Sequence, residues 1–327
     1  MTLNIDSPES APALPRIAYF PVSFFSMIMG LSGFTLAWKA AAGIFSSGTD
    51  IWIVFAYATS IAMIFVSIFY AIKIWHYPHA VLEEIHHPVR INFFPSFSIS
   101  LLLLSVVWQQ ETIVSTYLWM VGTALQIAFT LYVMSSWIHH THYTLSHANP
   151  SWFIPVVGNI IVPITGSQLG YIELSWFCFS IGIVFWLVLL TIIMYRLFFH
   201  EPLPARMTPM LFILLAPPSV GFISYTSMVG ELDAFARIIY YIALFLSLLL
   251  AMNIFRFIKV PFFISSWAYS FPVAALTVAT IKMAHLTSSL FFQTISVALL
   301  CMLTGLLLWL VTRTVKAIFA AEFCRPE

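Results

Sequence analysis

Polar residues interrupt this chain at intervals and leave between them a series of long apolar runs. A run of about 20 apolar residues is long enough to cross a bilayer as a helix. The runs cover residues 18–42, 51–73, 91–109, 113–137, 152–169, 172–196, 208–229, 235–257, 262–285 and 290–315. The pattern predicts an all-α polytopic membrane protein with ten transmembrane helices and no room for a soluble domain between them. We expect an N-terminal segment 1–16, a membrane domain 17–317 and a C-terminal tail 318–327.

Prolines follow the order of these runs, because every proline inside a run falls in an odd-numbered one. Five sites mark the odd runs: Phe20-Pro21, Phe94-Pro95, Ile154-Pro155, Ala216-Pro217-Pro218 and Phe271-Pro272. The chain therefore reads as one helical hairpin repeated five times. Proline bends a helix, and in lipid this is tolerated where a neighbouring helix or a water-filled cavity takes over the freed carbonyl. We predict that the five odd helices are bent at these prolines and share a pore-like interior.

The composition supports the membrane assignment, with 61% hydrophobic and 8% charged residues and a mean hydropathy of +0.98. Lys and Arg are retained on the cytoplasmic side of membrane proteins. With the N-terminus inside, all of the thirteen Lys and Arg residues except Lys39, Arg237 and Lys282 fall on that side. We therefore expect a multi-pass plasma-membrane protein with both termini cytoplasmic. The first 15 residues lack the basic start of a secretory signal, so we expect no cleavage.

Acidic residues are confined to the ends of the runs and to the connections between them. A carboxylate kept inside the membrane is typical of proton relays and ion coupling, and rings of acidic residues select cations. The absence of such residues from the predicted spans argues against a pump, a carboxylate-coupled antiporter and a cation channel.

Histidines and cysteines leave two interpretations open but define no metal site. Histidines cluster after the second and fourth runs, at His76, His79, His86 and His87 and at His139, His140, His142 and His147. They are either a metal-binding or pH-sensing group or polar residues at helix ends. Cys178, Cys301 and Cys324 have no paired spacing. We predict no cofactor and no metal.

Sequence motifs of catalysis are also missing, since the chain contains no GxSxG, no HExxH and no glycine-rich phosphate loop. We therefore expect no enzymatic activity. A net charge of +1 gives no indication of a nucleic-acid partner.

Small polar residues accompany the prolines of the odd runs and are candidates for lining a pore. We select Ser23, Ser96, Ser219 and Ser270. The alternative role for such hydroxyls is to bond backbone groups freed at the prolines and to let helices pack closely. Both roles are compatible at one position.

Five short stretches, in order along the chain, resemble the tellurite-resistance/dicarboxylate transporter (TDT) family, which includes bacterial TehA proteins, yeast malate permease and the plant anion channel SLAC1. The stretches are Phe20-Pro21 with Met29-Gly30-Leu31 and Ala37-Trp38, then His87-Pro88-Val89-Arg90, Asn149 to Gly158, Leu215 to Ser219, and Trp267 to Pro272. They run from the first span to the ninth. The length is similar to that of the bacterial members, so we expect a bacterial inner membrane.

The resemblance implies a homotrimer in which every protomer has its own pore, with the odd helices as an inner ring and the even helices as an outer ring. It also implies a gate at Phe271, next to Pro272, and small anions such as chloride and nitrate as the transported species. The alternative is a proton-coupled carrier of C4-dicarboxylates, malate or succinate, or a tellurite transporter. Five equivalent hairpins offer no pair of rocking halves, which favours the channel.

Overall fold

The computed structural model describes residues 15–45, 50–139, 143–320 and 323–324. Within these residues the chain is helical and contains no strand. Nine helical segments of the described chain are long and apolar enough to cross a membrane, and Pro150–Gly166 is a shorter apolar tenth. The ten segments coincide with the ten predicted runs, so the predicted fold class is confirmed.

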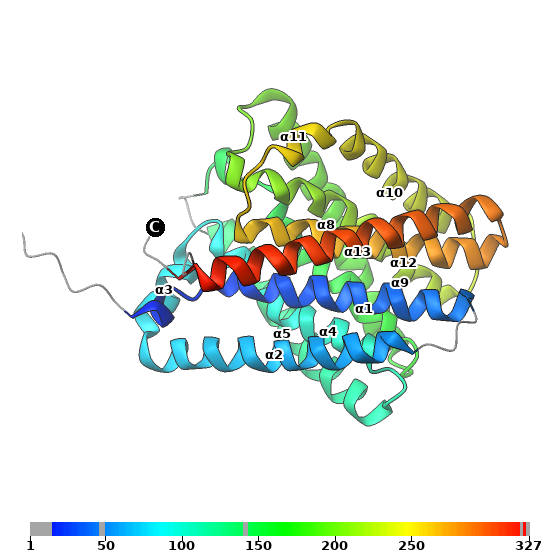
Figure 1. The fold of residues 1–327 in the computed structure, drawn as a ribbon, viewed down its shortest axis with the longest axis horizontal. Coiled ribbons are helices and arrows are strands. Elements are labelled where there is room, and N and C mark those ends of the chain that lie inside the picture. The colour runs from blue at the N-terminus through cyan, green and yellow to red at the C-terminus, as the bar shows by residue number, and fades with distance from the viewer. Residues whose placement is uncertain (1–14, 46–49, 140–142, 321–322, 325–327) are drawn as a thin grey trace, which may run out of the picture.

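The even spans are long single helices, and Figure 1 shows several of them lying along the length of the molecule. They are α2 (Ile51–His76), α5 (Thr112–His139), α8 (Ile172–Phe199), α10 (Ala234–Met252) and α13 (Leu290–Phe319). Two short helices, α3 (Pro78–His86) and α11 (Ile254–Ile258), follow α2 and α10. The five even-span helices contain no proline, as expected for spans that keep all their backbone hydrogen bonds.

The odd spans are built differently, because each begins with a 3-10 helix and continues as an α-helix. The 3-10 segments are η2 (Val22–Phe24), η3 (Arg90–Phe93), η5 (Pro150–Trp152), η7 (Ala205–Leu215) and η8 (Ile264–Tyr269). The α-helical parts are α1 (Phe25–Phe45), α4 (Pro95–Val107), α6 (Phe153–Val157) with α7 (Val162–Gly166), α9 (Ala216–Val229) and α12 (Ser270–Thr287). A second 3-10 segment of the fifth span, η6 (Gly158–Ile161), separates α6 from α7.

The five motif prolines lie where the helix type changes. Pro95, Pro155, Pro217 and Pro272 all fall in the first turn of an α-helix, and Pro21 immediately precedes η2. A proline in a first turn removes no intrahelical hydrogen bond, since that N–H has no partner there. In the third, fifth, seventh and ninth spans the proline thus lies at the start of an α-helical part, whereas in the first span it precedes the 3-10 segment. The predicted bend at these prolines stays a prediction.

The fifth span is interrupted in the middle, and side chains of the neighbouring α5 replace the missing helical bonds. The carbonyl of Pro155 accepts hydrogen bonds from Gln126 Nε2 at 2.9 Å and Thr130 Oγ1 at 2.7 Å. Gln126 in turn accepts from Ser98 Oγ at 2.7 Å. A Cβ at Gly158 would lie 2.6 Å from Gln126 Nε2 and 2.7 Å from Ile99 Cδ1, so a larger residue there would force these side chains to shift. A neighbouring helix thus satisfies the freed carbonyl, as the sequence analysis requires.

The odd spans form a closed inner ring and the even spans surround it. Going round the ring, α1 contacts α4, α4 contacts α6 and α7, α7 contacts α9, α9 contacts α12, and α12 contacts α1. Each odd span also packs on the even span that follows it. In the most apolar part of the long odd spans 56 to 78% of residues are buried, against 28 to 33% in the even spans. Both the five hairpins and the inner and outer rings are therefore confirmed.

Candidate functional site

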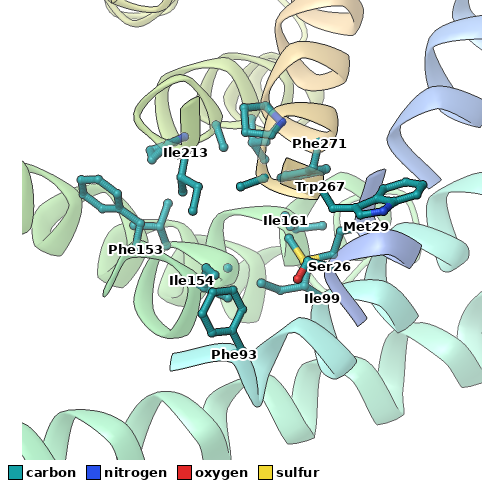
Figure 2. A pocket seen from close by; sticks show the side chains of 17 residues that line it. Ser26, Met29, Phe93, Ile99, Phe153, Ile154, Ile161, Ile213, Trp267 and Phe271 are labelled. Carbon is teal, nitrogen blue, oxygen red and sulfur yellow. The ribbon is translucent and has the colours of Figure 1, made fainter. Parts of the chain in front are cut away.

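A small cavity lies inside the inner ring and is bounded by all five odd spans. Its volume is about 60 Å³, and its lining is apolar apart from the hydroxyl of Ser26 and the indole nitrogen of Trp267. Figure 2 shows Ser26 and Met29 of α1 around this space with Phe93 and the Phe271 ring. We call it the Ser26 cavity.

A second cavity of about 250 Å³ is also bounded by all five odd spans. Among the described residues that line it, Lys39 is the only charged one and Gln109 the only other polar one. The remaining lining side chains are apolar or glycine. We call this space the Lys39 cavity.

The two cavities lie at successive depths of the inner ring. The Ser26 cavity is lined by the N-terminal part of every odd span and the Lys39 cavity by the C-terminal part. All odd spans run in the same direction, since each hairpin restores it. Two residues, Val220 and Phe271, line both cavities. Phe271 is only 9% exposed, so its side chain is packed within the inner ring where the two linings meet.

Two glycines of α1 allow α12 to approach closely where it carries Phe271. A Cβ at Gly33 would lie 2.8 Å from Ala274 Cβ and 3.4 Å from Cδ2 of the Phe271 ring. A Cβ at Gly30 would lie 2.7 Å from Ser270 Cβ and would also meet the Ser270 hydroxyl. The backbone of α1 therefore forms one wall against the Phe271 turn.

We expect Gly30→Ala to lower stability by about 1–3 kcal/mol, because an added methyl in a well-packed interior forces its neighbours to shift. Gly43→Ala, on the same helix, is the matched control, since nothing lies within 4 Å of a Cβ there. The control should be neutral or stabilising by up to about 1 kcal/mol. Thermal unfolding of the detergent-solubilised variants measures both. Equal melting temperatures for the two variants would contradict the close packing.

The four predicted pore-lining serines lie outside the linings of these two cavities. Ser96 and Ser270 donate to the carbonyls of Phe93 and Trp267, the latter at 2.6 Å. Ser219 is fully buried and its hydroxyl has no hydrogen-bond partner among the described residues. The carbonyl of Ser23 accepts from the Ser26 hydroxyl. Ser26, one turn further along than Ser23, is the serine that reaches a cavity.

Of the five motif prolines, Pro217 and Pro272 line the Ser26 cavity. Pro21, Pro95 and Pro155 lie outside both linings and shape the start of their spans. The structure thus brings together the prolines of the seventh and ninth spans with the Phe271 ring.

The histidine clusters do not assemble a metal site in the described chain. No group of three or more His, Cys, Asp or Glu side chains among the described residues is arranged to hold a metal ion. His76 and His86 place Nδ1 against the backbone carbonyls of Ile72 and Leu82, four residues earlier on their helices. His140 and His142 lie outside the described residues. A role for these clusters in sensing pH stays a prediction.

A buried ion pair near the start of the first span escaped the sequence analysis. Glu84 of α3 lies in a connection, as predicted, yet its side chain and that of Lys73 are only 4% and 2% exposed and their charged groups are 3.0 Å apart. Tyr70 donates to the same carboxylate at 2.9 Å. Lys73 also donates to the Phe20 carbonyl at 2.9 Å, and the Val22 N–H donates to Glu84. The pair therefore ties the start of the first inner span to α2 and α3.

The two lysines that fall outside the predicted cytoplasmic set both lie on inner helices. Lys39 lines its cavity from α1. Lys282 of α12 donates to the Ile223 carbonyl at 3.1 Å and to Ser227 Oγ at 2.9 Å. Ile223 itself lines the Lys39 cavity. In the sequence, both lysines stood out because they are not on the predicted cytoplasmic side. That position was the available sign that they lie inside the inner ring.

The fold and these cavities define a polytopic membrane protein in which five inner helices enclose two axial cavities that share one phenylalanine. The chain belongs to the SLAC1 family, since the model of that family, described as a voltage-dependent anion channel, matches residues 19–315. The resemblance stated from the five stretches is thereby confirmed.

Curated relatives include proteins of Arabidopsis thaliana and Haemophilus influenzae. The chain is 31% identical to the S-type anion channel SLAH3 of Arabidopsis thaliana over 96% of this chain and 51% of the relative. It is 30% identical to the guard cell S-type anion channel SLAC1 of the same plant, over 88% of this chain and 55% of the relative. A tellurite resistance protein TehA homolog of Haemophilus influenzae is 25% identical over 81% of both chains. The chain spans about half the length of these two plant relatives.

Proposed function

We propose that this chain is an anion channel whose pore runs through the inner ring and is closed by Phe271. The observation that carries the proposal is the position of this ring, which lines both the Ser26 cavity and the Lys39 cavity. A ring between two cavities on one axis blocks ions and water, and apolar constrictions of this kind gate by excluding water. Residues 17–317 form the pore domain in this proposal.

The permeant species we propose are small anions such as chloride and nitrate. None of the described residues that line either cavity is acidic, and Lys39 is the only charged one. A passage with one cation and no carboxylate favours anions over cations. The names of the plant relatives, S-type anion channels, support the same sign of charge. The proposed assembly is a homotrimer in a plasma membrane, with both termini cytoplasmic and one pore in each protomer.

The alternative function is a coupled carrier of C4-dicarboxylates or of tellurite, and the tellurite resistance relative favours the latter substrate. Proton coupling uses Asp, Glu or His side chains that exchange protons along the transport path, and none of the described residues that line either cavity is of these types. The buried carboxylate of Glu84 is held by Lys73 and Tyr70 and lies outside both cavities. Because this carboxylate is already bonded and is not in either cavity, the structure favours the channel over a proton-coupled carrier.

Purified protein in liposomes distinguishes the two functions. For a channel, we expect the reversal potential to follow the chloride or nitrate gradient and to be unaffected by a pH gradient. A carrier would instead accumulate malate or succinate against its gradient when protons flow inward. Liposomes without protein are the control for leak. Uphill dicarboxylate uptake driven by the pH gradient would contradict the proposed channel.

A further inference from the structure

We propose that Lys39 forms a binding site for a small monovalent anion on one side of Phe271 only, which makes the pore electrostatically asymmetric. This inference rests on the proposed channel function. It concerns the Lys39 cavity, which contains one charged side chain, in contrast to the Ser26 cavity, which contains none among its described lining residues.

The ammonium group of Lys39 is held in position by the end of a neighbouring inner helix. Its Nζ donates to the carbonyl of Val107 at 2.7 Å and of Val106 at 3.2 Å. These are the last two residues of α4, where carbonyls lack intrahelical partners and carry the negative end of the helix dipole. The ring of Trp52 lies 5.0 Å from the same Nζ, at cation–π distance. The charge is therefore fixed at the cavity wall.

A lysine ammonium has three N–H donors, and two of those of Lys39 are directed at carbonyls. Nζ makes no third hydrogen bond to the described residues, which leaves one donor for a ligand in the cavity that the side chain lines. The cavity volume of about 250 Å³ exceeds the roughly 30 Å³ that one water takes up in the liquid. An anion can therefore contact Nζ and keep part of its hydration shell.

The charge balance of the cavity favours a monovalent ligand. One lining ammonium, already shared with two carbonyls, offers a single weak attraction to an anion. Conduction requires such weak binding, because an ion must also leave the site. A dicarboxylate would need a second cation within the cavity. The other lysine of the inner helices that falls outside the predicted cytoplasmic set, Lys282, is bonded to Ile223 and Ser227 and is not part of the lining.

The asymmetry has a consequence for the direction of current. A cleft lined by one sign of charge concentrates counter-ions. Anions therefore accumulate on the Lys39 side of Phe271 and enter the constriction from that side more often than from the Ser26 side. In symmetric salt, the current carried by anions moving from the Lys39 cavity to the Ser26 cavity should exceed the reverse current.

Planar bilayer recordings of Lys39→Gln test the site. Glutamine keeps a donor for the Val107 carbonyl and removes the charge. To keep currents measurable, the wild-type protein and the Lys39→Gln variant are each recorded with and without the additional substitution Phe271→Ala. At low salt we expect the conductance to fall about tenfold, at the lower end of the enrichment that charged clefts produce. At 1 M salt the difference should shrink, because the Debye length is then about 3 Å. Rectification should disappear with the charge.

Three variants keep the result interpretable. Lys39→Arg retains the charge and should conduct and rectify like the wild type. Lys316→Gln, on the exposed face of α13, removes one lysine that lines neither cavity and should change nothing. Lys39→Cys should regain low-salt conductance with a cationic thiol reagent and not with a neutral one of similar size. This last comparison uses one protein and is independent of any folding defect in Lys39→Gln.

The outcomes separate this inference from the channel function. A wild-type channel that conducts anions, together with a Lys39→Gln variant of unchanged low-salt conductance and rectification, overturns the Lys39 site alone. Failure of the cationic reagent to restore conductance overturns it as well. If neither the wild-type protein nor the Phe271→Ala variant passes anions, the channel function fails, and the Lys39 site fails with it.

Discussion

Phe271→Ala is expected to raise anion conductance by at least about tenfold, which corresponds to lowering the permeation barrier by about 1.4 kcal/mol. The ring lines both cavities and is 9% exposed. Its removal joins the Ser26 cavity to the Lys39 cavity and lets water and ions cross a level that is otherwise filled by apolar atoms. Currents in oocytes or planar bilayers, normalised to the amount of protein at the membrane, measure the effect.

Phe222→Ala is the matched control for this experiment. Phe222 also lies on an inner helix and is fully buried, but its ring packs against Tyr240 of the outer helix α10, 5.2 Å between centroids. The control loses the same ring and suffers the same kind of core destabilisation, about 3–5 kcal/mol, without opening the axis. Phe271→Leu should fall between the wild type and alanine. Currents of Phe271→Ala no larger than those of the control would remove Phe271 as the gate.

The arrangement of the helices was predictable because it depends on local and repeated features. Apolar runs separated by polar residues mark each span, and a proline in each odd run marks it as the different member of its hairpin. What the prolines do locally was not predictable in the same way. Proline fits a bend as well as a first turn, and only the 3-10 segment ahead of Pro95 or Pro272 reveals the second case.

The candidate site was only partly predictable, because its geometry depends on contacts between distant residues. Phe271 could be selected by resemblance, whereas its position between two cavities requires all five inner spans. Ser96 and Ser270 have the composition expected of a polar lining, yet their hydroxyls bond backbone carbonyls three residues earlier. Hydropathy likewise assigns Glu84 to a connection. It does not predict burial, because the cation that compensates the carboxylate, Lys73, belongs to another helix.

The Lys73–Glu84 pair connects the outer helix α2 to the first inner span. Glu84 accepts from Lys73, Tyr70 and the Val22 N–H, and Lys73 also bonds the Phe20 carbonyl. These backbone groups flank Pro21, directly ahead of the turn that brings Ser26 to its cavity. The pair thus sets the starting point of a wall of the Ser26 cavity, and its loss should affect both stability and the shape of the passage.

Lys73→Met is expected to destabilise the protein by about 3–5 kcal/mol, because removal of one partner leaves a buried charge uncompensated. The double variant Lys73→Met with Glu84→Gln should recover at least half of this loss, since it has no buried charge and the amide still bonds Tyr70 and Val22. Thermal unfolding of the detergent-solubilised single and double variants gives the coupling directly. Lys259→Met, at an exposed position, should melt like the wild type. The pair would contribute no coupling if Lys73→Met were as stable as that control, or if the loss of stability in the double variant equalled the sum of the losses in the two single variants. Packing alone would then anchor the first inner span.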